Sequence, residues 1–367
     1  MLKKYPIIKW SLICLGTLMA MLFGFGWWFM SLIPEKEERE LIKQTTVNDL
    51  SYLNENIPAC RGKVLAVVTS ATEMGNSGKG TGYELTELSR AYYVFQANGF
   101  EVDIASPKGG EPKVIIDDED MGSYDFAFLK DSLAQYKSKH TLPVAHINPS
   151  DYKAVFFVGG KGAMFDFPNN KAIQNLVREL YQSNRVVGAV CHGPAALVHV
   201  TLDNGQHLLQ DKMVSGFTND EELFLIPEAE DIFPFLLQRE LEAQGAKFSE
   251  GATYLEHISH EKNLVTGQNP WSTWKMAETM IEEMGYTPKY RKLTAEENTV
   301  TVLKTYDTKG SGSAKQLIAN LYRQRKLEVE RVLIAKHGII AAMRGDFGRF
   351  FGLVRLTAYS KKISHQS

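Results

Sequence analysis

Between residues 61 and 287, short continuous apolar runs alternate with stretches whose apolar side chains recur every three or four residues. The first pattern predicts strands and the second predicts helices, with strands at 63–69, 101–105, 154–158 and 185–190 and helices at 84–98 and 171–182. Strands that are apolar throughout are typical of a parallel sheet covered by helices on both faces. The pattern therefore predicts an α/β fold whose chemistry lies at the carboxyl ends of the strands.

A polar segment at 108–150, acidic in IIDDEDMGSYD, interrupts this alternation. It is too long for a plain connection between a strand and a helix. We therefore expect an insertion near the carboxyl ends of the strands.

The N-terminal region has no charged side chain from Trp10 to Pro34 and is apolar enough to cross a bilayer as one helix of about 20 residues. Trp27, Trp28 and Phe29 stand where a signal peptide would have small residues before its cleavage site, and they suit a membrane–water interface. Three lysines precede this stretch and the mostly acidic EKEERE follows it. The positive-inside rule then predicts an uncleaved anchor with its N-terminus in the cytoplasm and the rest of the chain on the extracytoplasmic side.

The other end of the chain is basic. Residues 289–367 carry 16 Lys+Arg and 6 Asp+Glu, a net charge of +10, whereas residues 1–288 carry 25 and 37, a net charge of −12. The net charge of −2 for the whole chain therefore hides two parts of strongly opposite charge. The tail is predicted to begin with a polar linker through KTYDTKGSGSA and to continue as helix, with apolar and basic residues interleaved. It either lies on anionic lipid or packs as a helical extension on the domain or a partner subunit. The extracytoplasmic placement argues against a nucleic-acid partner.

Four parts are therefore expected. Residues 1–34 form a cytoplasmic N-terminus with a transmembrane anchor, and residues 35–60 form a charged and partly helical stalk. A catalytic domain follows at 61–287, and a basic, helical C-terminal extension at 288–367. An apolar content of 44% and a charged content of 23% are ordinary for a globular protein, which excludes wholesale disorder and a multi-span membrane protein.

The most informative motif is RVVGAV-Cys191-His192-Gly193-Pro194, which follows the strand at 185–190. Gly193 and Pro194 predict a sharp turn that opens a helix, so the thiol of Cys191 is presented at the sheet edge. It would face the positive end of that helix, which favours the thiolate. A buried structural cysteine is the alternative for Cys191 taken alone. The adjoining His-Gly-Pro in this strand-turn-helix context favours a nucleophile.

The AVCHGPAAL segment is joined by VFFVGGKGAMFDFP upstream, GTGYELTELSRAYYVF near the start, SGFTNDEE downstream and NLVTGQNPWS near the end. Together these five motifs resemble the DJ-1/PfpI superfamily over residues 61–285. More narrowly, the motifs are similar to those of the branch that contains glyoxalase III, whose members are also described as heat-inducible chaperones and protein deglycases. The resemblance implies a flavodoxin-like, class I glutamine amidotransferase-like sandwich that works without a cofactor.

The resemblance also implies roles for single residues. Cys191 falls on the nucleophile and His192 on its general base. The acid that orients this histidine matches Glu222, with Asp220 and Glu221 as the substitutes.

A second acid, which hydrogen-bonds the cysteine sulfur in the family, matches Glu87 rather than Glu84 by register against the Gly82 turn. An ordinary solvated helix acid is the alternative for Glu87. Gly159 and Gly160 match the loop whose backbone N–H forms an oxyanion hole with that of His192.

The implied function is a glutathione-independent glyoxalase III-like enzyme, a lyase of the D-lactate dehydratase type. It would convert methylglyoxal or glyoxal to lactate or glycolate through a hemithioacetal on Cys191, with deglycase or chaperone activity as further implications. The expected partners are a small dicarbonyl substrate and the membrane, and a homodimer is left open. Two alternatives use the same residues: a cysteine hydrolase or amidotransferase-like enzyme, and a redox-sensing holdase in which Cys191 is oxidised.

Other signals are weaker. GNSGKGTG lacks the P-loop spacing because Glu73 takes the place of the first glycine and Gly80 that of the Ser/Thr. His257 and His260 have ligand spacing without an accompanying Cys or carboxylate pattern, so no metal is expected. The three cysteines, Cys14, Cys60 and Cys191, include no C-x-x-C pair, which excludes a disulfide framework and a Cys-rich zinc module.

Overall fold

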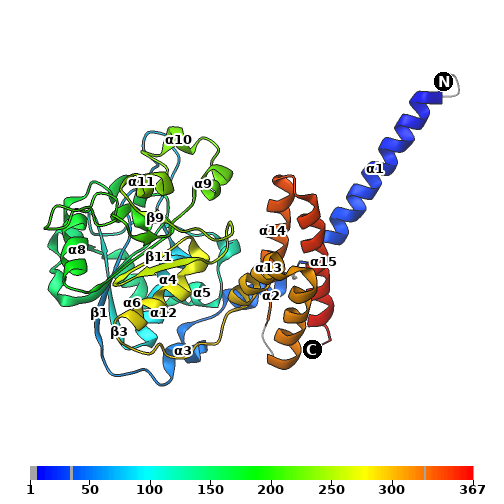
Figure 1. Cartoon of the computed structure of the whole chain (residues 1–367). Coiled ribbons are helices and arrows are strands. Elements are labelled where there is room, and N and C mark those ends of the chain that lie inside the picture. Colours follow the sequence, from blue (N-terminus) through cyan, green and yellow to red (C-terminus); the bar gives the residue numbers. More distant parts are fainter. Residues whose placement is uncertain (1–5, 34–35, 326–327, 367) are drawn as a thin grey trace. The chain divides into compact units, whose positions relative to one another are not determined.

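The computed structural model describes residues 6–33, 36–325 and 328–366. It divides into two compact units (Figure 1). We call residues 41–291 the sheet unit, and residues 1–40 together with 292–367 the helical unit. Each is described by itself.

The sheet unit is built on a seven-stranded sheet with the order β10-β11-β7-β6-β1-β3-β5. Every neighbouring pair is parallel except β10 and β11, which confirms the predicted mostly parallel sheet. The strands are β1 (Gly62–Val67), β3 (Phe100–Ser106), β5 (Leu142–Pro143), β6 (Tyr152–Phe157), β7 (Val186–Val190), β10 (Ile258–Glu261) and β11 (Leu264–Gly267). The four predicted strands are the central ones, and their apolar runs are buried throughout their second halves.

Helices cover both faces of this sheet. The connection from β1 to β3 contains α4 (Leu85–Ala97), and the connection from β6 to β7 contains α8 (Lys171–Gln182). In the strand order, β3 follows β1, whereas β7 precedes β6, so the two connections cross the sheet in opposite directions. Because such crossovers are right-handed, α4 and α8 lie on opposite faces of the sheet. After β11, α12 (Thr273–Glu283) packs on β7 and β11 and against α4 (Figure 1).

The segment predicted as an insertion is ordered and contributes to the fold. Its helix α5 (Ser123–Lys130) packs on α4, its helix α6 (Ser132–Lys139) packs on α5 and β3, and β5 becomes the edge strand of the sheet. Four further short strands form two minor two-stranded sheets. These pairs are β2 (Tyr83–Glu84) with β4 (Val114–Ile115), and β8 (Met213–Val214) with β9 (Lys247–Phe248).

The remaining helices of the sheet unit are short. They are α3 (Ser51–Asn54), α7 (Ala163–Asp166), α9 (Asn219–Leu225), α10 (Ala229–Ile232) and α11 (Leu237–Ala243). Of these, α9 carries a residue of the site described below, and α10 directly precedes another, Phe233.

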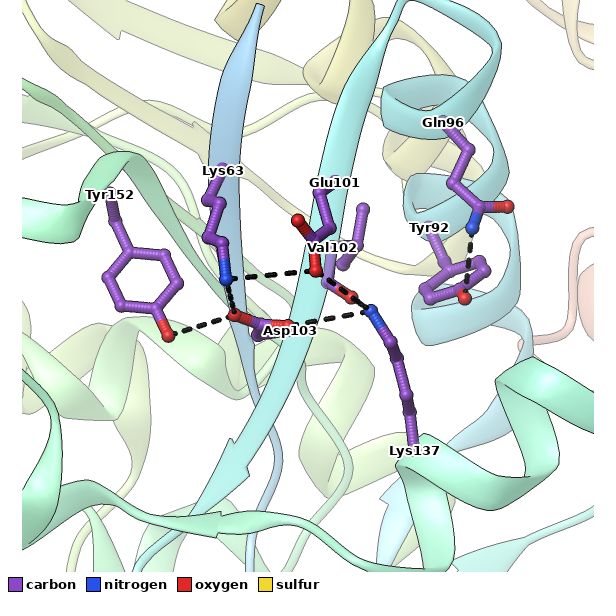
Figure 2. A network of polar contacts seen from close by, with 8 residues as sticks. All are labelled: Lys63, Tyr92, Gln96, Glu101, Val102, Asp103, Lys137 and Tyr152. Carbon is purple, nitrogen blue, oxygen red and sulfur yellow. Dashed lines mark hydrogen bonds and ion pairs between the residues drawn. The ribbon is translucent and has the colours of Figure 1, made fainter. Parts of the chain in front are cut away.

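Asp103 on β3 links three strands and α6 (Figure 2). Its Oδ2 accepts hydrogen bonds from Nζ of Lys63 at 3.2 Å and from the hydroxyl of Tyr152 at 3.1 Å. Nζ of Lys137 lies 3.4 Å from its Oδ1 and donates to the carbonyl of Val102 at 2.7 Å. Lys63 and Tyr152 stand at the starts of β1 and β6, so this half-buried cluster fixes strand positions away from the carboxyl ends.

The helical unit contains α1 (Pro6–Met30), α2 (Lys36–Lys43, which reaches into the sheet unit), α13 (Ala295–Asn320), α14 (Arg331–Met343) and α15 (Phe347–Ser364). The predicted helical C-terminal extension is confirmed, but the polar linker through KTYDTKGSGSA is wrong. Those residues lie within α13, which is kinked at Gly310, where φ is +81°. The backbone at Gly310 is not helical, so α13 consists of two helical halves, and each half buries apolar side chains, Val302 and Leu303 before the kink and Ile318 after it.

Candidate active site

Cys191 follows the last residue of β7 and lies between two neighbouring backbone segments. Its N–H donates to the carbonyl of Gly267 at 2.9 Å, and its carbonyl accepts from the N–H of Phe217 at 2.9 Å. Its φ is +58°, a conformation that non-glycine residues seldom adopt. A strained backbone held by hydrogen bonds on both sides fixes the direction of the Cys191 side chain.

The helix expected after Cys191 is absent, because Gly193–Ala196 form only a short 3₁₀ turn. Burial raises the pKa of the Cys191 thiol, and negative charge on Glu87 raises it further. The prediction that a helix N-terminus lowers this pKa is therefore wrong. A thiolate at this position needs a proton acceptor next to the sulfur.

That acceptor is available in His192. Nδ1 of His192 lies 3.3 Å from Sγ of Cys191, and its Nε2 lies 2.5 Å from Oε2 of Glu222. Its ring is flanked by two phenylalanines, with centroids 4.6 Å from Phe217 and 6.2 Å from Phe233. The imidazole thus connects the thiol to a carboxylate inside an apolar enclosure that the sequence reasoning did not identify as part of the site.

Glu222 owes its position to the start of α9. Thr218 caps this helix, because its hydroxyl oxygen accepts a hydrogen bond from the backbone N–H of Glu221. In turn, the carboxylate of Glu221 accepts a hydrogen bond from the backbone N–H of Thr218. This capping box sets the rotation of the first turn. Glu222, the next residue, then projects its carboxylate onto His192.

The two neighbouring acids have other partners. Oε1 of Glu221 accepts from the N–H of Tyr254 at 2.7 Å and from the side-chain amides of Gln268 and Asn269 at 2.9 and 3.0 Å. Asp220 accepts the hydroxyl of Thr253 at 2.8 Å. Of the three acids considered for His192, the structure therefore places Glu222 in contact with it.

Glu87, in the first turn of α4, reaches the sulfur from another direction. Its Oε2 accepts the N–H of Gly159 at 2.6 Å, and its side chain interacts with the Cys191 thiol. Oε1 is buried and has no hydrogen-bond partner within the described part of the chain. Burial raises the pKa of the Glu87 carboxyl well above its usual range, and the charge of Glu84 adds to this effect. The protonated carboxyl is therefore favoured beside the thiol.

The glycine loop after β6 lies against the same atoms. A Cβ at Gly159 would lie 2.6 Å from Oε2 of Glu87 and 2.8 Å from Cβ of Cys191, so only glycine fits. Because its N–H is bonded to Glu87, Gly159 is not the free oxyanion donor that the sequence led us to expect. Gly160, with φ of +100°, and His192 keep N–H groups that donate to no other group among the described residues.

Glu84 is a second acid near the centre that the sequence reasoning set aside in favour of Glu87. Burial raises the pKa of Glu84 to about 7, with Lys161 opposing the shift and Asp117 and Asp120 adding to it. Its N–H donates to the carbonyl of Gly159 at 3.3 Å. Its negative charge raises the pKa of both Glu87 and Cys191. Its burial could not be read from a helix face pattern, because Glu84 precedes the helix.

Metal binding finds no support in the described segments, which bring no three His, Cys, Asp or Glu side chains together in a suitable group. His257 contacts the hydroxyl of Ser249 at 2.9 Å, and His260 contacts Glu283 at 2.9 Å. The chemistry available at the site is that of a thiol, an imidazole and carboxyl groups.

Comparison with known proteins gives consistent matches. Residues 79–216 match the model of the DJ-1/PfpI family. Glyoxalase 3 of Candida albicans is 31% identical over 236 residues, which cover 60% of this chain and 97% of that protein. A glutathione-independent glyoxalase of Schizosaccharomyces pombe is 30% identical over 243 residues, covering 61% of this chain and 96% of the relative.

Solved structures agree with these relatives. The Rapid Encystment Protein 24 KDa of Francisella tularensis is 36% identical with a TM-score of 0.58, covering 61% of this chain and 99% of that one. Glyoxalase III of Candida albicans is 28% identical with a TM-score of 0.57, covering 62% and 98%. About two fifths of the present chain thus lies outside each of these matches.

Proposed function

Because this chain belongs to the DJ-1/PfpI family, we propose that it is a glutathione-independent glyoxalase that converts methylglyoxal to lactate, and glyoxal to glycolate. Relatives that bear this name match about three fifths of this chain over nearly their full length, and the site geometry supplies the groups that the reaction needs. The conclusion rests on one arrangement above all. The sulfur of Cys191 contacts both His192 and Glu87, so a nucleophile lies next to two groups that can move protons.

The first step is addition of the thiol to the aldehyde. Nδ1 of His192 takes the proton from Sγ, and the sulfur forms a bond to the aldehyde carbon, giving a hemithioacetal. Glu222 stabilises the imidazolium that results. The new oxyanion is held by the N–H groups of Gly160 and His192.

The second step moves a proton between the two substrate carbons. The imidazolium of His192 first gives its proton to the oxyanion, which becomes a hydroxyl. Neutral His192, or Glu87 in its ionised form, then removes the proton from the former aldehyde carbon and returns it to the neighbouring carbon, while the hydroxyl proton passes to the neighbouring oxygen, leaving a thioester of lactate on Cys191. Water then hydrolyses the thioester and restores the thiol. One methylglyoxal and one water give one lactate, so no redox partner is needed.

The test is consumption of methylglyoxal and formation of lactate by the full-length protein in detergent, without glutathione. Cys191→Ala should lower the rate at least about 10³-fold, because the covalent step is lost. Cys60→Ala is the matched control, since Cys60 is an exposed free cysteine, and it should retain full activity. An inactive wild-type protein, alongside an active relative in the same assay, would refute the proposal.

The same variants separate the alternatives. Amide or ester hydrolysis that depends on Cys191, with no dicarbonyl turnover, would identify a hydrolase. Protection of a client protein from aggregation that survives Cys191→Ala, again without turnover, would identify a holdase.

We also propose that α1 anchors the chain in a membrane with the sheet unit on the extracytoplasmic side. The helix contains an 18-residue window, Ile13–Met30, with mean hydropathy 1.7, and none of that window is buried within the described structure. Trp27 and Trp28 are exposed at its end, where a membrane interface would lie. The charge difference between its two flanks sets the orientation.

A further inference from the structure

The helical unit has a second apolar surface besides α1. It lies at the turn between α14 and α15, an antiparallel helix pair (Figure 1). We define the hairpin tip as Ile339, Met343, Phe347 and Phe351. Their side chains are 45%, 70%, 60% and 47% exposed, so four large apolar groups face solvent around one turn. A group of this kind usually marks a binding surface.

The tip lies alongside the end of α1. The ring of Phe25 on α1 has centroids 6.2 Å from Phe350 and 6.4 Å from Phe351, at the start of α15. Further along, Nζ of Lys361 on α15 donates to the carbonyl of Ser31, just after α1. Contact points thus follow the same order along both helices, so α15 and the last turns of α1 run in the same general direction.

The direction of α15 relative to α1 determines on which side of Ser31 the hairpin tip lies. If Ser31 marks the membrane surface, Phe25 lies about 9 Å deeper, at a rise of about 1.5 Å per residue. Phe347 is one turn closer to the N-terminus of α15 than Phe351, so it lies on the same side of Ser31 as Phe25. We infer that the hairpin tip inserts into the outer part of the bilayer that holds α1, and that it contacts lipid directly. The inference rests on the proposed span and not on the proposed catalysis.

The exposed side chains of α15 support a lipid occupant. Phe347, Phe351 and Arg355 recur every four residues and are exposed, and Lys362 is exposed further along. Apolar groups therefore stand at the inserted end and cations nearer the surface, as expected for a helix at an interface with anionic head groups.

Two charged side chains near the tip have partners within the protein. Oδ1 of Asp346 accepts the backbone N–H of Arg349 at 2.9 Å and so caps α15, and the guanidinium of Arg349 forms an ion pair with Asp307 at 3.1 Å. The ion pair and the capping bond lower the cost of placing these groups near lipid. Insertion to the depth of head groups and first methylenes, about 5–10 Å, is consistent with Arg344 at the turn.

The experiment uses the full chain with Cys14→Ser, Cys60→Ser and Cys191→Ala. Met343→Cys is labelled with an environment-sensitive fluorophore, and the protein is placed in vesicles of phosphatidylcholine and phosphatidylglycerol. Gln366→Cys is the matched control, because Gln366 is exposed beyond the other end of α15. Lipids with a spin label on the upper acyl chain should quench the label at 343 at least about twofold more than the label at 366.

Equal quenching at both positions would overturn the inference. So would a protected label at 343 that lipid does not quench, since a second copy of the chain would then cover the tip. Extraction of the vesicles with alkaline carbonate distinguishes a missing anchor from a tip that does not insert. A protein that stays in the membrane without quenching at 343 retains its anchor but lacks the inserted tip. Release by carbonate would mean that α1 does not span, and the inference would fail with it.

Discussion

Oε2 of Glu222 lies 2.5 Å from Nε2 of His192, while the residue before it, Glu221, accepts hydrogen bonds from a different set of donors. Two consecutive carboxylates, both buried, thus have separate tasks. One contacts the imidazole, and the other fastens the start of α9. This division can be tested by exchanging each acid for its amide.

Glu222→Gln should lower methylglyoxal turnover about 10²-fold, because the imidazolium loses its counter-charge. Its melting temperature should stay close to that of the wild type. Glu221→Gln should instead lose about 2 kcal/mol of stability, because several hydrogen bonds to a charged acceptor are weakened. Turnover and thermal unfolding of both variants give the comparison, and a large loss of turnover at Glu221 alone would contradict the assignment.

Glu87→Gln should make the protein more resistant to unfolding at neutral and alkaline pH. Burial raises the pKa of Glu87, so the native state holds its proton more tightly than the unfolded state. The stability from this group is fully present below the unfolded pKa and is lost as pH rises toward the folded pKa. The variant has no such loss, and its advantage in melting temperature should grow from pH 4 upward.

The control for that series is Glu73→Gln, which changes an exposed acid. A difference between wild type and Glu87→Gln that is constant with pH would show that ionisation of Glu87 is not the cause.

Glu84→Gln should shift the alkylation of Cys191 by iodoacetamide to lower pH. The charge of Glu84 raises the pKa of the thiol, and its own pKa of about 7 means that this charge develops in the neutral range. Removing the charge favours the thiolate, which is the reactive form. Mass spectrometry of the Cys191 peptide across pH measures the midpoint, and an unchanged or higher midpoint would exclude this electrostatic effect.

Cys60 offers a native reporter of membrane orientation, because it is exposed and lies in the sheet unit beyond α1. A membrane-impermeant maleimide should label it in right-side-out vesicles without permeabilisation. Labelling only after permeabilisation would place the sheet unit in the cytoplasm. Cys60→Ala supplies the background.

The sequence predicted the central part of this fold well, because continuous burial on both faces leaves an unambiguous signal. The helix at 171–182 coincides with α8, and the four predicted strands overlap β1, β3, β6 and β7 within two residues at each end. The edge strands β5 and β10 gave no such signal, since they are short and only partly buried.

At the site, the limits had local causes. The rotation of α9 decides which acid of NDEE contacts His192. The capping box between Thr218 and Glu221 fixes this rotation, and Glu221 is held in addition by the N–H of Tyr254, which lies far along the chain. Gly193 and Pro194 signalled a turn correctly, but they did not show that only a 3₁₀ turn follows. Gly193 also contacts the backbone closely, since a Cβ there would lie 2.3 Å from the carbonyl oxygen of Phe157. The enclosing Phe217 and Phe233 come from separate segments, which no spacing rule joins.

The helical unit is assembled from both ends of the chain, with α1 before the sheet unit and α13 to α15 after it. During synthesis the sheet unit therefore leaves the ribosome while its neighbour still lacks three of its helices. Phe25 and Ser31 are therefore synthesised long before Phe350 and Lys361, the residues that they contact. The order of translation thus makes docking of α15 onto α1 a late event, and a ribosome paused before α14 would leave α1 without this partner.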